Sequence, residues 1–251
     1  LIANNPKNAE VIFPYIGGEE ANESPTHSHH RYVIDFRDRS EHDCWNQWPD
    51  VMRLLEKKVK PQRQERKPNG EFKQRKPLPE RWWIHAEKRP GLYANLASSN
   101  LVCITGLIRK HHSFALVPSG MVYAHTTVVL PMQEVSEFSL IQSSIHWVWT
   151  EFQSSSLEDR PIYTPSTCSQ PFPYPEALAS VLADVGLAYE GFRSQVMVAN
   201  NEGLTSTYNR FHDPSETSPE LLELRRLHGE MDQAVLQAYG WSDLSTACGF
   251  G

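Results

Sequence analysis

The sequence has none of the segments that direct a chain into or across a membrane. No apolar run approaches the ~18–20 residues that cross a bilayer, and the start, Leu1-Ile2-Ala3-Asn4-Asn5-Pro6, lacks a basic region followed by an apolar core. The few cysteines form neither a CxxC pair nor a secreted disulfide framework: Cys44, Cys103, Cys168 and Cys248. We therefore expect a cytoplasmic protein, and the missing initiator Met indicates a piece of a longer chain.

The sequence also lacks the motifs of common catalytic sites. It contains no glycine-rich phosphate loop and no nucleotide-binding fingerprint, and no Ser or Cys nucleophile motif accompanies His125. Pro49-Asp50 with Glu56-Lys57-Lys58 has the residue types of a PD-ExK nuclease, but that site needs its carboxylates on strands, and this spacing is short and helical. Asn4-Asn5-Pro6 lacks the aromatic residue with which an NPPY-type motif stacks on a flipped base. We expect no catalytic residue, no metal and no cofactor in this segment.

One histidine cluster deserves a separate hypothesis. His27, His29 and His30 lie close enough in sequence to bind a metal together. No Cys or carboxylate completes the set of ligands, which favours a polar loop. A free-standing metallohydrolase built on these three residues is the weakest of three functions that we consider, and metal analysis of the purified protein would test it.

The spacing of apolar residues predicts an α+β fold with a mixed or antiparallel sheet and packed helices. Strand patterns occupy residues 11–18, 31–36, 101–105, 113–117 and 126–130. Helical patterns occupy residues 44–60, 82–96 and 138–152. In the last of these, Phe138, Val148 and Phe152 belong to one apolar stripe with three- and four-residue spacing.

The composition shifts after Pro175. Residues 176 to 243 carry 11 acidic residues against 4 basic ones. Apolar spacing predicts one helix from Leu178 to Met197 and another from Leu221 to Tyr239. We expect a helical C-terminal domain over residues 176–251, acidic on its outer side.

Basic residues are concentrated in one stretch, although the whole chain has a net charge of −6. Residues 53 to 89 contain 13 Lys and Arg against 5 Glu. Such a segment suits contact with DNA phosphates, and the alternative is a solvated loop around Pro68-Asn69-Gly70. The basic turn at Arg109-Lys110 suits the same contact or an ordinary hairpin end. The expected phosphate contacts are Lys57, Lys58, Lys60, Arg63, Arg66, Lys67, Lys73, Arg75, Lys76, Arg109 and Lys110.

The stretch from 138 to 175 organises the rest of the chain. A helix is followed by the charged loop Leu157-Glu158-Asp159-Arg160-Pro161, and alternate prolines then stiffen the exit at residues 171–175. In an extended segment, Glu158 and Arg160 point to the same side. Arg can bind the O6 and N7 of guanine, and Glu can accept from the N4 amino group of cytosine, so the two could recognise one C·G pair. The alternative is a surface salt bridge within the loop.

Several runs carry a resemblance to a known family. The chain resembles the target recognition domain and C-terminal helices of the MmeI-like restriction–modification enzymes, in which one polypeptide carries a nuclease, an adenine-specific DNA methyltransferase and a DNA-recognition domain. The matching runs are Trp82-Trp83, residues 86–93, residues 143–146, residues 163–166, Phe172-Pro173, residues 207–214 and residues 231–235.

The resemblance implies a domain layout and a set of base contacts. Residues 1–20 would connect to a methyltransferase domain of the same polypeptide that binds S-adenosylmethionine, and residues 21–175 would be the DNA target recognition domain. One base pair would be recognised at Glu158 and Arg160, and a second near Thr105 to Leu107 and at His125-Thr126. The partner is then double-stranded DNA. A protein-interaction module of a larger bacterial assembly, using the acidic C-terminal helices, is the alternative function.

Overall fold

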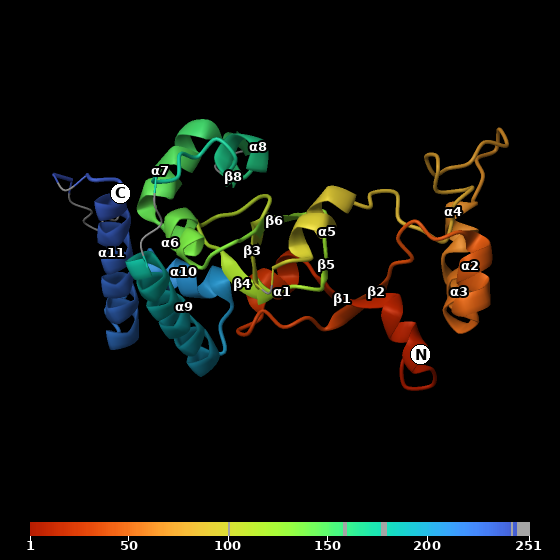
Figure 1. Ribbon diagram of the computed structural model, residues 1–251, viewed down its shortest axis with the longest axis horizontal. Coiled ribbons are helices and arrows are strands. Elements are labelled where there is room, and N and C mark those ends of the chain that lie inside the picture. Colours follow the sequence, from red (N-terminus) through yellow and green to blue (C-terminus); the bar gives the residue numbers. More distant parts are fainter. Residues whose placement is uncertain (100, 158–159, 177–179, 242, 245–251) are drawn as a thin grey trace. The chain divides into compact units, whose positions relative to one another are not determined.

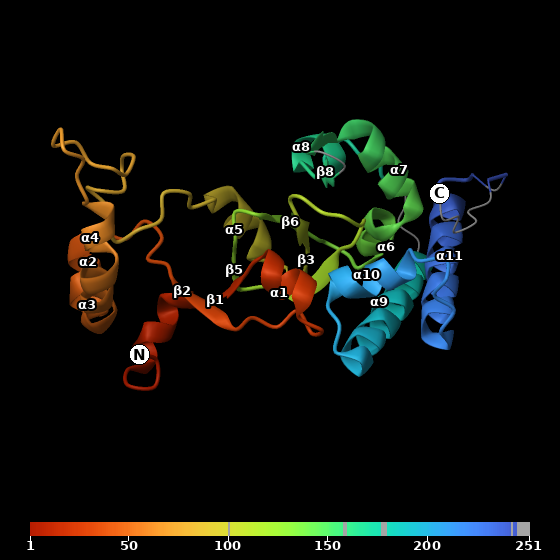
Figure 2. The same ribbon diagram turned by 180° about the vertical axis from the view of Figure 1, so that it is seen from behind.

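The computed structural model describes residues 1–99, 101–157, 160–176, 180–241 and 243–244. The chain divides into two compact units (Figures 1 and 2). Unit 1 comprises Leu1–Tyr15, His30–Ala94 and Gly120–Val122, and unit 2 comprises Ile16–His29, Asn95–Ser119 and Tyr123–Gly251. Helices and small antiparallel sheets make up both units, so the predicted α+β class is confirmed. Within the described ranges, no helix is long and apolar enough to cross a membrane.

Unit 1 contains a small sheet and a group of short helices. A 3₁₀ helix, η1 (Pro6–Glu10), leads into β1 (Ile12–Ile16), which pairs antiparallel with β2 (Arg31–Ile34). The short strand β5 (Val122–Tyr123) completes this sheet on the other side of β1. The strands predicted at 11–18 and 31–36 are therefore confirmed. The helices are α2 (Glu41–Gln47), α3 (Pro49–Lys58) and α4 (Lys60–Arg63).

The single helix predicted over 44–60 is wrong, because it is interrupted at Trp48. The backbone of Trp48 leaves the helical region, with φ −134° and ψ 57°, and Pro49 then takes the first position of α3, where its missing N–H costs nothing. The indole nitrogen of Trp48 donates to the carbonyl oxygen of Lys7 at 3.1 Å. The predicted apolar stripe does form the core of unit 1, which consists of Val11, Phe36, Cys44, Trp48, Val51, Met52, Leu55, Trp82 and Ile84.

The helix predicted over 82–96 is much shorter, since α5 spans only Pro90–Leu96. Arg89 has a φ of 45°, which is outside the helical region, and Pro90 restricts the residue before it. The helix therefore begins at the proline. Trp82 and Trp83 precede it in irregular backbone, where the indole nitrogen of Trp83 donates to the carbonyl oxygen of Arg39 at 3.0 Å.

Unit 2 is built on a three-stranded antiparallel sheet of order β4-β3-β6. Its strands are β3 (Leu101–Gly106), β4 (Ala115–Pro118) and β6 (Thr127–Pro131), which confirms the three strands predicted there. Cys103 lies in the central strand, opposite Leu116 on one side and Leu130 on the other. The helix α1 (Gly18–Glu23) packs against β3.

The helix predicted from residue 138 is two helices, α6 (Ser136–Gln142) and α7 (Ser144–Gln153). The backbone of Ser143 is extended, and its hydroxyl oxygen accepts from the backbone N–H of His146 at 3.3 Å, so Ser143 caps α7. A short hairpin follows, formed by β7 (Ser155–Leu157) and β8 (Arg160–Ile162), and then the helical turn α8 (Pro165–Cys168).

Three further helices complete unit 2: α9 (Ser180–Asn200), α10 (Leu204–Phe211) and α11 (Pro219–Ala238). The two long helices were predicted, whereas α10 was not. α9 packs along both α6 and α11 (Figures 1 and 2), and residues from these helices form a core together with Phe172: Leu140, Leu182, Ala234 and Val235. The compact unit thus extends across residue 175, and a functional domain boundary at that residue stays a prediction.

Candidate nucleic-acid interface

Three segments that are distant in sequence meet at the end of β3. The backbone N–H of Leu107 donates to the carbonyl oxygen of Thr126 at 2.8 Å, and the carbonyl oxygen of Leu107 accepts from the N–H of Tyr163 at 2.9 Å. Next to it, Ile108 forms an isolated antiparallel bridge with Ile162. One short piece of backbone therefore holds the turn at residues 125–126 on one side and the β7–β8 hairpin on the other.

The turn between β5 and β6 presents two polar side chains. His125 and Thr126 are both exposed, and the N–H of Thr127 closes the turn by donating to the carbonyl oxygen of Ala124 at 3.1 Å. Both residues were predicted to contact bases, and the structure leaves their side chains available for such a contact.

Thr105 was also predicted to contact a base, and the structure does not support this role. The residue is buried, and its hydroxyl donates to the carbonyl oxygen of Ser113 at 2.8 Å. Alternate residues of a strand point to opposite faces, and Thr105 falls on a covered face of β3. Its hydroxyl is used inside the unit, whereas Ile108, three residues later, is exposed.

The region expected to be a charged loop is a β-hairpin. Ser155 pairs with Ile162, and Leu157 pairs with Arg160. Glu158 lies outside the described residues, and of Arg160 only the backbone, at the start of β8, is described. Their proposed base contacts stay a prediction.

Arg109 is the clearest correction among the predicted DNA contacts, because its guanidinium group is buried. The group lies 4.4 Å from the centre of the Tyr163 ring and 4.9 Å from that of Phe114, and its Nη2 donates to Nδ1 of His112 at 3.0 Å. Burial lowers its pKa to about 10. The guanidinium of Arg109 is surrounded by aromatic faces and a neutral imidazole, whereas an arginine that binds phosphate is exposed to solvent. Lys110 is exposed as expected, and its Nζ donates to Oδ1 of Asn209 at 2.7 Å.

The rings of His112, Phe114, His146 and Tyr163 form a cluster in the interior of unit 2, next to the end of β8. Because Arg109 can only donate, Nδ1 of His112 must accept, and Nε2 of His112 then donates to the carbonyl oxygen of Ile141 at 2.7 Å. His146 on α7 shares a 2.9 Å hydrogen bond with the hydroxyl of Tyr163. Burial lowers the pKa of His146 to about 3, and the pKa of His112 is also well below its usual value. The cluster is therefore held together by neutral imidazoles and one cation.

Comparison with known proteins identifies the family. A model of the family described as "MmeI, target recognition domain" matches residues 1–176. The chain belongs to this family. A search of the curated proteins found no match. Among solved structures, the chain is similar to one described as the Type IIL restriction–modification enzyme MmeI in complex with DNA, with a TM-score of 0.63 and 19% identity over 98% of this chain. The chain spans 30% of the length of that protein.

The basic stretch expected to contact DNA lies in unit 1, and acidic partners already engage much of it. Lys60 pairs with Glu56 at 2.9 Å, and other pairs form between Lys67 and Glu71, Lys73 and Glu65, Arg75 and Glu87, and Lys76 and Glu80. Such exposed pairs are worth only ~0–1 kcal/mol, so a phosphate can displace the carboxylate at little cost. Lys57 and Lys58 are exposed and form no ion pair with a residue that the structure describes.

Two arginines of this stretch have structural partners. Nη1 of Arg63 donates to the carbonyl oxygens of Trp82, at 2.9 Å, and Ile84. Nη1 of Arg66 donates to the carbonyl oxygen of Gly70 at 2.6 Å, and its guanidinium lies 4.0 Å from the centre of the Phe72 ring. Arg63 is half-buried, which lowers its pKa. We therefore assign Arg63 to holding the backbone after Trp82, in place of the expected phosphate contact.

The histidines at 27, 29 and 30 gain no support as a metal site. Among the described residues, no group of three or more His, Cys, Asp or Glu side chains is arranged to hold a metal ion. His27 is buried, and its Nδ1 bonds to the carbonyl oxygen of Ala21 at 2.9 Å. This contact orients the ring towards its own unit.

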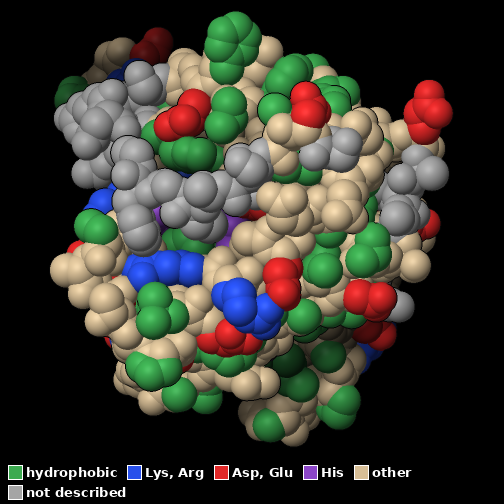
Figure 3. All heavy atoms as spheres, turned by 90° about the vertical axis from the view of Figure 1, so that its left-hand side faces the viewer, with side chains coloured by type: hydrophobic (Ala, Val, Ile, Leu, Met, Phe, Trp, Pro, Cys, Tyr) green, Lys and Arg blue, Asp and Glu red, His purple; other side chains and the backbone are tan. Residues whose placement is uncertain are grey.

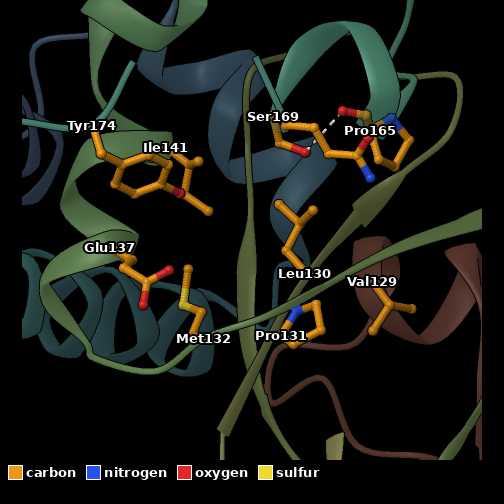
Figure 4. Close-up of a pocket in the computed structure, with 10 residues that line it drawn as sticks. Val129, Leu130, Pro131, Met132, Glu137, Ile141, Pro165, Ser169 and Tyr174 are labelled. Atoms are coloured by element: carbon orange, nitrogen blue, oxygen red, sulfur yellow. Dashed lines mark hydrogen bonds between the residues drawn. The ribbon is translucent and has the colours of Figure 1, made fainter. Parts of the chain in front are cut away.

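A cavity of about 230 Å³ lies in unit 2 between β6, α6 and α8 (Figure 4). Its walls are largely apolar and include Leu130 and Ile141, with Glu137 and Tyr174 on one side. The carboxylate of Glu137 already accepts from the backbone N–H groups of Gln133 and Glu134, at 2.8 and 3.0 Å. Both bonds reach the same oxygen, Oε1, and they hold the Glu137 side chain at the start of α6.

The buried histidines make the fold sensitive to acid. Burial lowers the pKa of His27 to about 4 and that of His146 to about 3, against a value of 6.5 in the unfolded chain. The unfolded chain thus binds more protons below pH 6.5, and stability must fall as the pH drops, by up to ~1.4 kcal/mol per pH unit for each histidine. We expect a clear loss of urea stability between pH 7.5 and pH 5.

The variant His27→Asn tests the assignment of this loss. The backbone of His27 has a φ of 51°, which Asn tolerates, and the Asn amide can replace the bond to Ala21. Between pH 7.5 and pH 5 the variant should lose less stability than the unaltered chain. The difference between the two losses should equal the contribution of one histidine. Equal urea stability of the unaltered chain at both pH values would contradict the interpretation.

Proposed function

We propose that this chain recognises a sequence of double-stranded DNA as the target recognition module of a restriction–modification enzyme. The family match over residues 1–176 supports the class of function. The observation that carries the proposal is the backbone of Leu107, which joins the exposed His125-Thr126 turn to the β7–β8 hairpin. Two polar segments held at a fixed spacing are what recognition of neighbouring base pairs requires.

The chemistry of the two segments suits the major groove. That groove admits a two-stranded β-ribbon, and its base edges distinguish all four base pairs. We assign Arg160 to a guanine and Glu158 to the paired cytosine. His125 and Thr126 can each donate or accept a hydrogen bond, so they would contact a second base pair.

The rest of the enzyme enters the proposal by family membership. The sequence holds no nucleotide-binding fingerprint. We therefore place S-adenosylmethionine and the transfer of the methyl group in a methyltransferase domain N-terminal to Leu1 in the same polypeptide, and we place the whole enzyme in the bacterial cytoplasm. In this scheme the chain selects the site at which the adenine is methylated.

Selection from a random library of duplex DNA tests the proposal. The unaltered chain should enrich sequences that share one short motif, and its affinity should fall steeply as the salt concentration rises. Failure to enrich any motif at low salt would contradict the proposed function.

Removing two cations of unit 1 should weaken this binding without changing its sequence preference. In the variant Lys57→Gln, Lys58→Gln, we expect the slope of log affinity against log salt to decrease by about two, because each lysine releases roughly one counterion from DNA. The matched control is Arg226→Gln on α11, which removes an exposed cation from the acidic side of unit 2 and should leave the slope unchanged. A changed motif with an unchanged slope would contradict the phosphate assignment.

A second candidate function is contact with another protein, and the surface of the C-terminal helices favours it. Figure 3 shows the side of unit 2 that includes α11, where apolar and acidic side chains are prominent. The exposed large apolar residues of α9 and α11 are Val181, Leu187, Val198 and Leu222. A chain that binds no DNA but forms a stable complex with its own methyltransferase domain would favour this function over the first.

A further inference from the structure

Tyr163 joins the surface hairpin to the interior of unit 2. It directly follows β8, and its side chain is fully buried. Its backbone N–H donates to Leu107, its hydroxyl shares a hydrogen bond with Nε2 of His146, and the guanidinium of Arg109 lies 4.4 Å from the centre of its ring. The chain that leaves the hairpin is thus anchored by backbone, hydroxyl and ring at once.

The chain that enters the hairpin is anchored by α7, whose orientation is unusual. This helix buries His146 and Thr150 and exposes Val148 and Phe152, at 63% and 85% of their surface. The reverse arrangement would bury more apolar area, so burial of apolar surface alone does not set this orientation. The inward polar face brings His146 to Tyr163, and the hydrogen bond between them joins the entry of the hairpin to its exit.

The start of α7 is fixed from the C-terminal helices. Oδ1 of Asp232 on α11 accepts from the backbone N–H of Ser144 at 2.8 Å. A carboxylate at this position satisfies a free N–H group and interacts favourably with the positive end of the helix. α7 is therefore held at its first residue by α11 and at His146 by the hairpin exit.

We propose that Tyr163, Arg109 and His146 are positioning residues, which set the place of the β7–β8 hairpin relative to the His125-Thr126 turn. The inference rests on the proposed function. A hairpin with three-residue strands is not stable alone, so its position must come from such anchors. The described partners of Arg109 are neutral groups, so its guanidinium can stack on Tyr163 without competition from a carboxylate. These residues would act on base recognition without contacting DNA.

The test compares two tyrosines that each lose a buried hydroxyl contact. Tyr163→Phe removes the bond to His146, and the control Tyr208→Phe removes a 2.6 Å bond to Tyr189 and one from Arg193, neither of which involves a residue of β7 or β8. Selection from the same random duplex library is then repeated with each variant. Tyr163→Phe should reduce the preference at the base pair contacted by the hairpin about tenfold, which is near the lower end of the discrimination that one base contact provides. The preferences at the other positions and the salt slope should stay unchanged. Tyr208→Phe should keep the whole motif.

The outcomes separate this inference from the proposed function. If the unaltered chain enriches a motif and Tyr163→Phe keeps it unchanged, or weakens every position alike, the positioning role is overturned and the proposed function stands. If the unaltered chain enriches nothing, the proposed function fails, and this inference fails with it.

Two further measurements test the inference without relying on the DNA selection with Tyr163→Phe alone. Arg109→Lys keeps the charge and loses the planar group that stacks on Tyr163, so it should weaken the same base preference. Hydrogen exchange of the backbone amides in β7 and β8 should become at least tenfold faster in Tyr163→Phe and stay unchanged in Tyr208→Phe. Unchanged exchange in β7 and β8 of Tyr163→Phe would overturn the inference without reference to DNA.

Discussion

Exchanging the chemistry of positions 158 and 160, by Glu158→Lys together with Arg160→Asp, is expected to change the preferred base pair from C·G to G·C. The lysine can donate to the O6 and N7 of guanine from the position that we propose to face cytosine, and the aspartate can accept from cytosine N4 at the other position. Each contact should discriminate by ~1–3 kcal/mol against the wrong base. Methylation mapping of DNA from a host that carries the full-length double variant would show the change.

Single substitutions provide the controls for this exchange. Glu158→Ala removes the acceptor for the cytosine amino group and should relax specificity at one position only. Glu158→Lys alone places two positive groups over one base pair and should mainly reduce activity. If all three variants methylate the original sites with the original preference, the two residues form an ordinary surface salt bridge.

The strands of both units could be predicted from the sequence because their signal is local. Apolar and polar residues alternate in the segment of β2, and apolar runs between polar turns mark β1, β3, β4 and β6. The ends of helices were less predictable. Ser143 and Trp48 interrupt helical patterns through backbone conformations that depend on distant partners, as in the hydrogen bond from Trp48 to Lys7.

The candidate site was only partly visible in the sequence for a related reason. The family resemblance indicated a base contact at His125 and Thr126, and both side chains are exposed. Nothing in the run Arg109-Lys110-His111-His112 shows that the first residue points inward and the second outward. That difference arises from Phe114 and Tyr163, which line the interior where Arg109 stacks. The inward histidine and outward Phe152 of α7 were also not visible in the sequence, because they go with the hydrogen bond between His146 and Tyr163.

The second prediction with a large expected effect concerns the buried Arg193 in α9. Its Nη2 donates to the carbonyl oxygen of Phe114 at 2.6 Å and to Glu190, and its Nη1 donates to the hydroxyl of Tyr208 at 2.9 Å. One side chain thus ties α9 to α10 and to the start of β4. Arg193→Met should lower the free energy of unfolding by ~3–5 kcal/mol, because it leaves Glu190 buried without its cation. Urea unfolding at pH 7.5 measures the loss.

Three comparisons make this result specific to the buried pair. Arg226→Met removes an arginine that pairs with Glu223 and Glu230 on the exposed side of α11, and it should leave the urea midpoint unchanged. Adding Glu190→Leu to Arg193→Met should restore part of the lost stability, since the unpaired carboxyl is gone. Burial raises the pKa of Glu190, so the loss in Arg193→Met should also shrink as the pH falls and the carboxyl takes up a proton. An Arg193→Met chain as stable as the Arg226→Met chain would show that α9 is held by apolar packing alone.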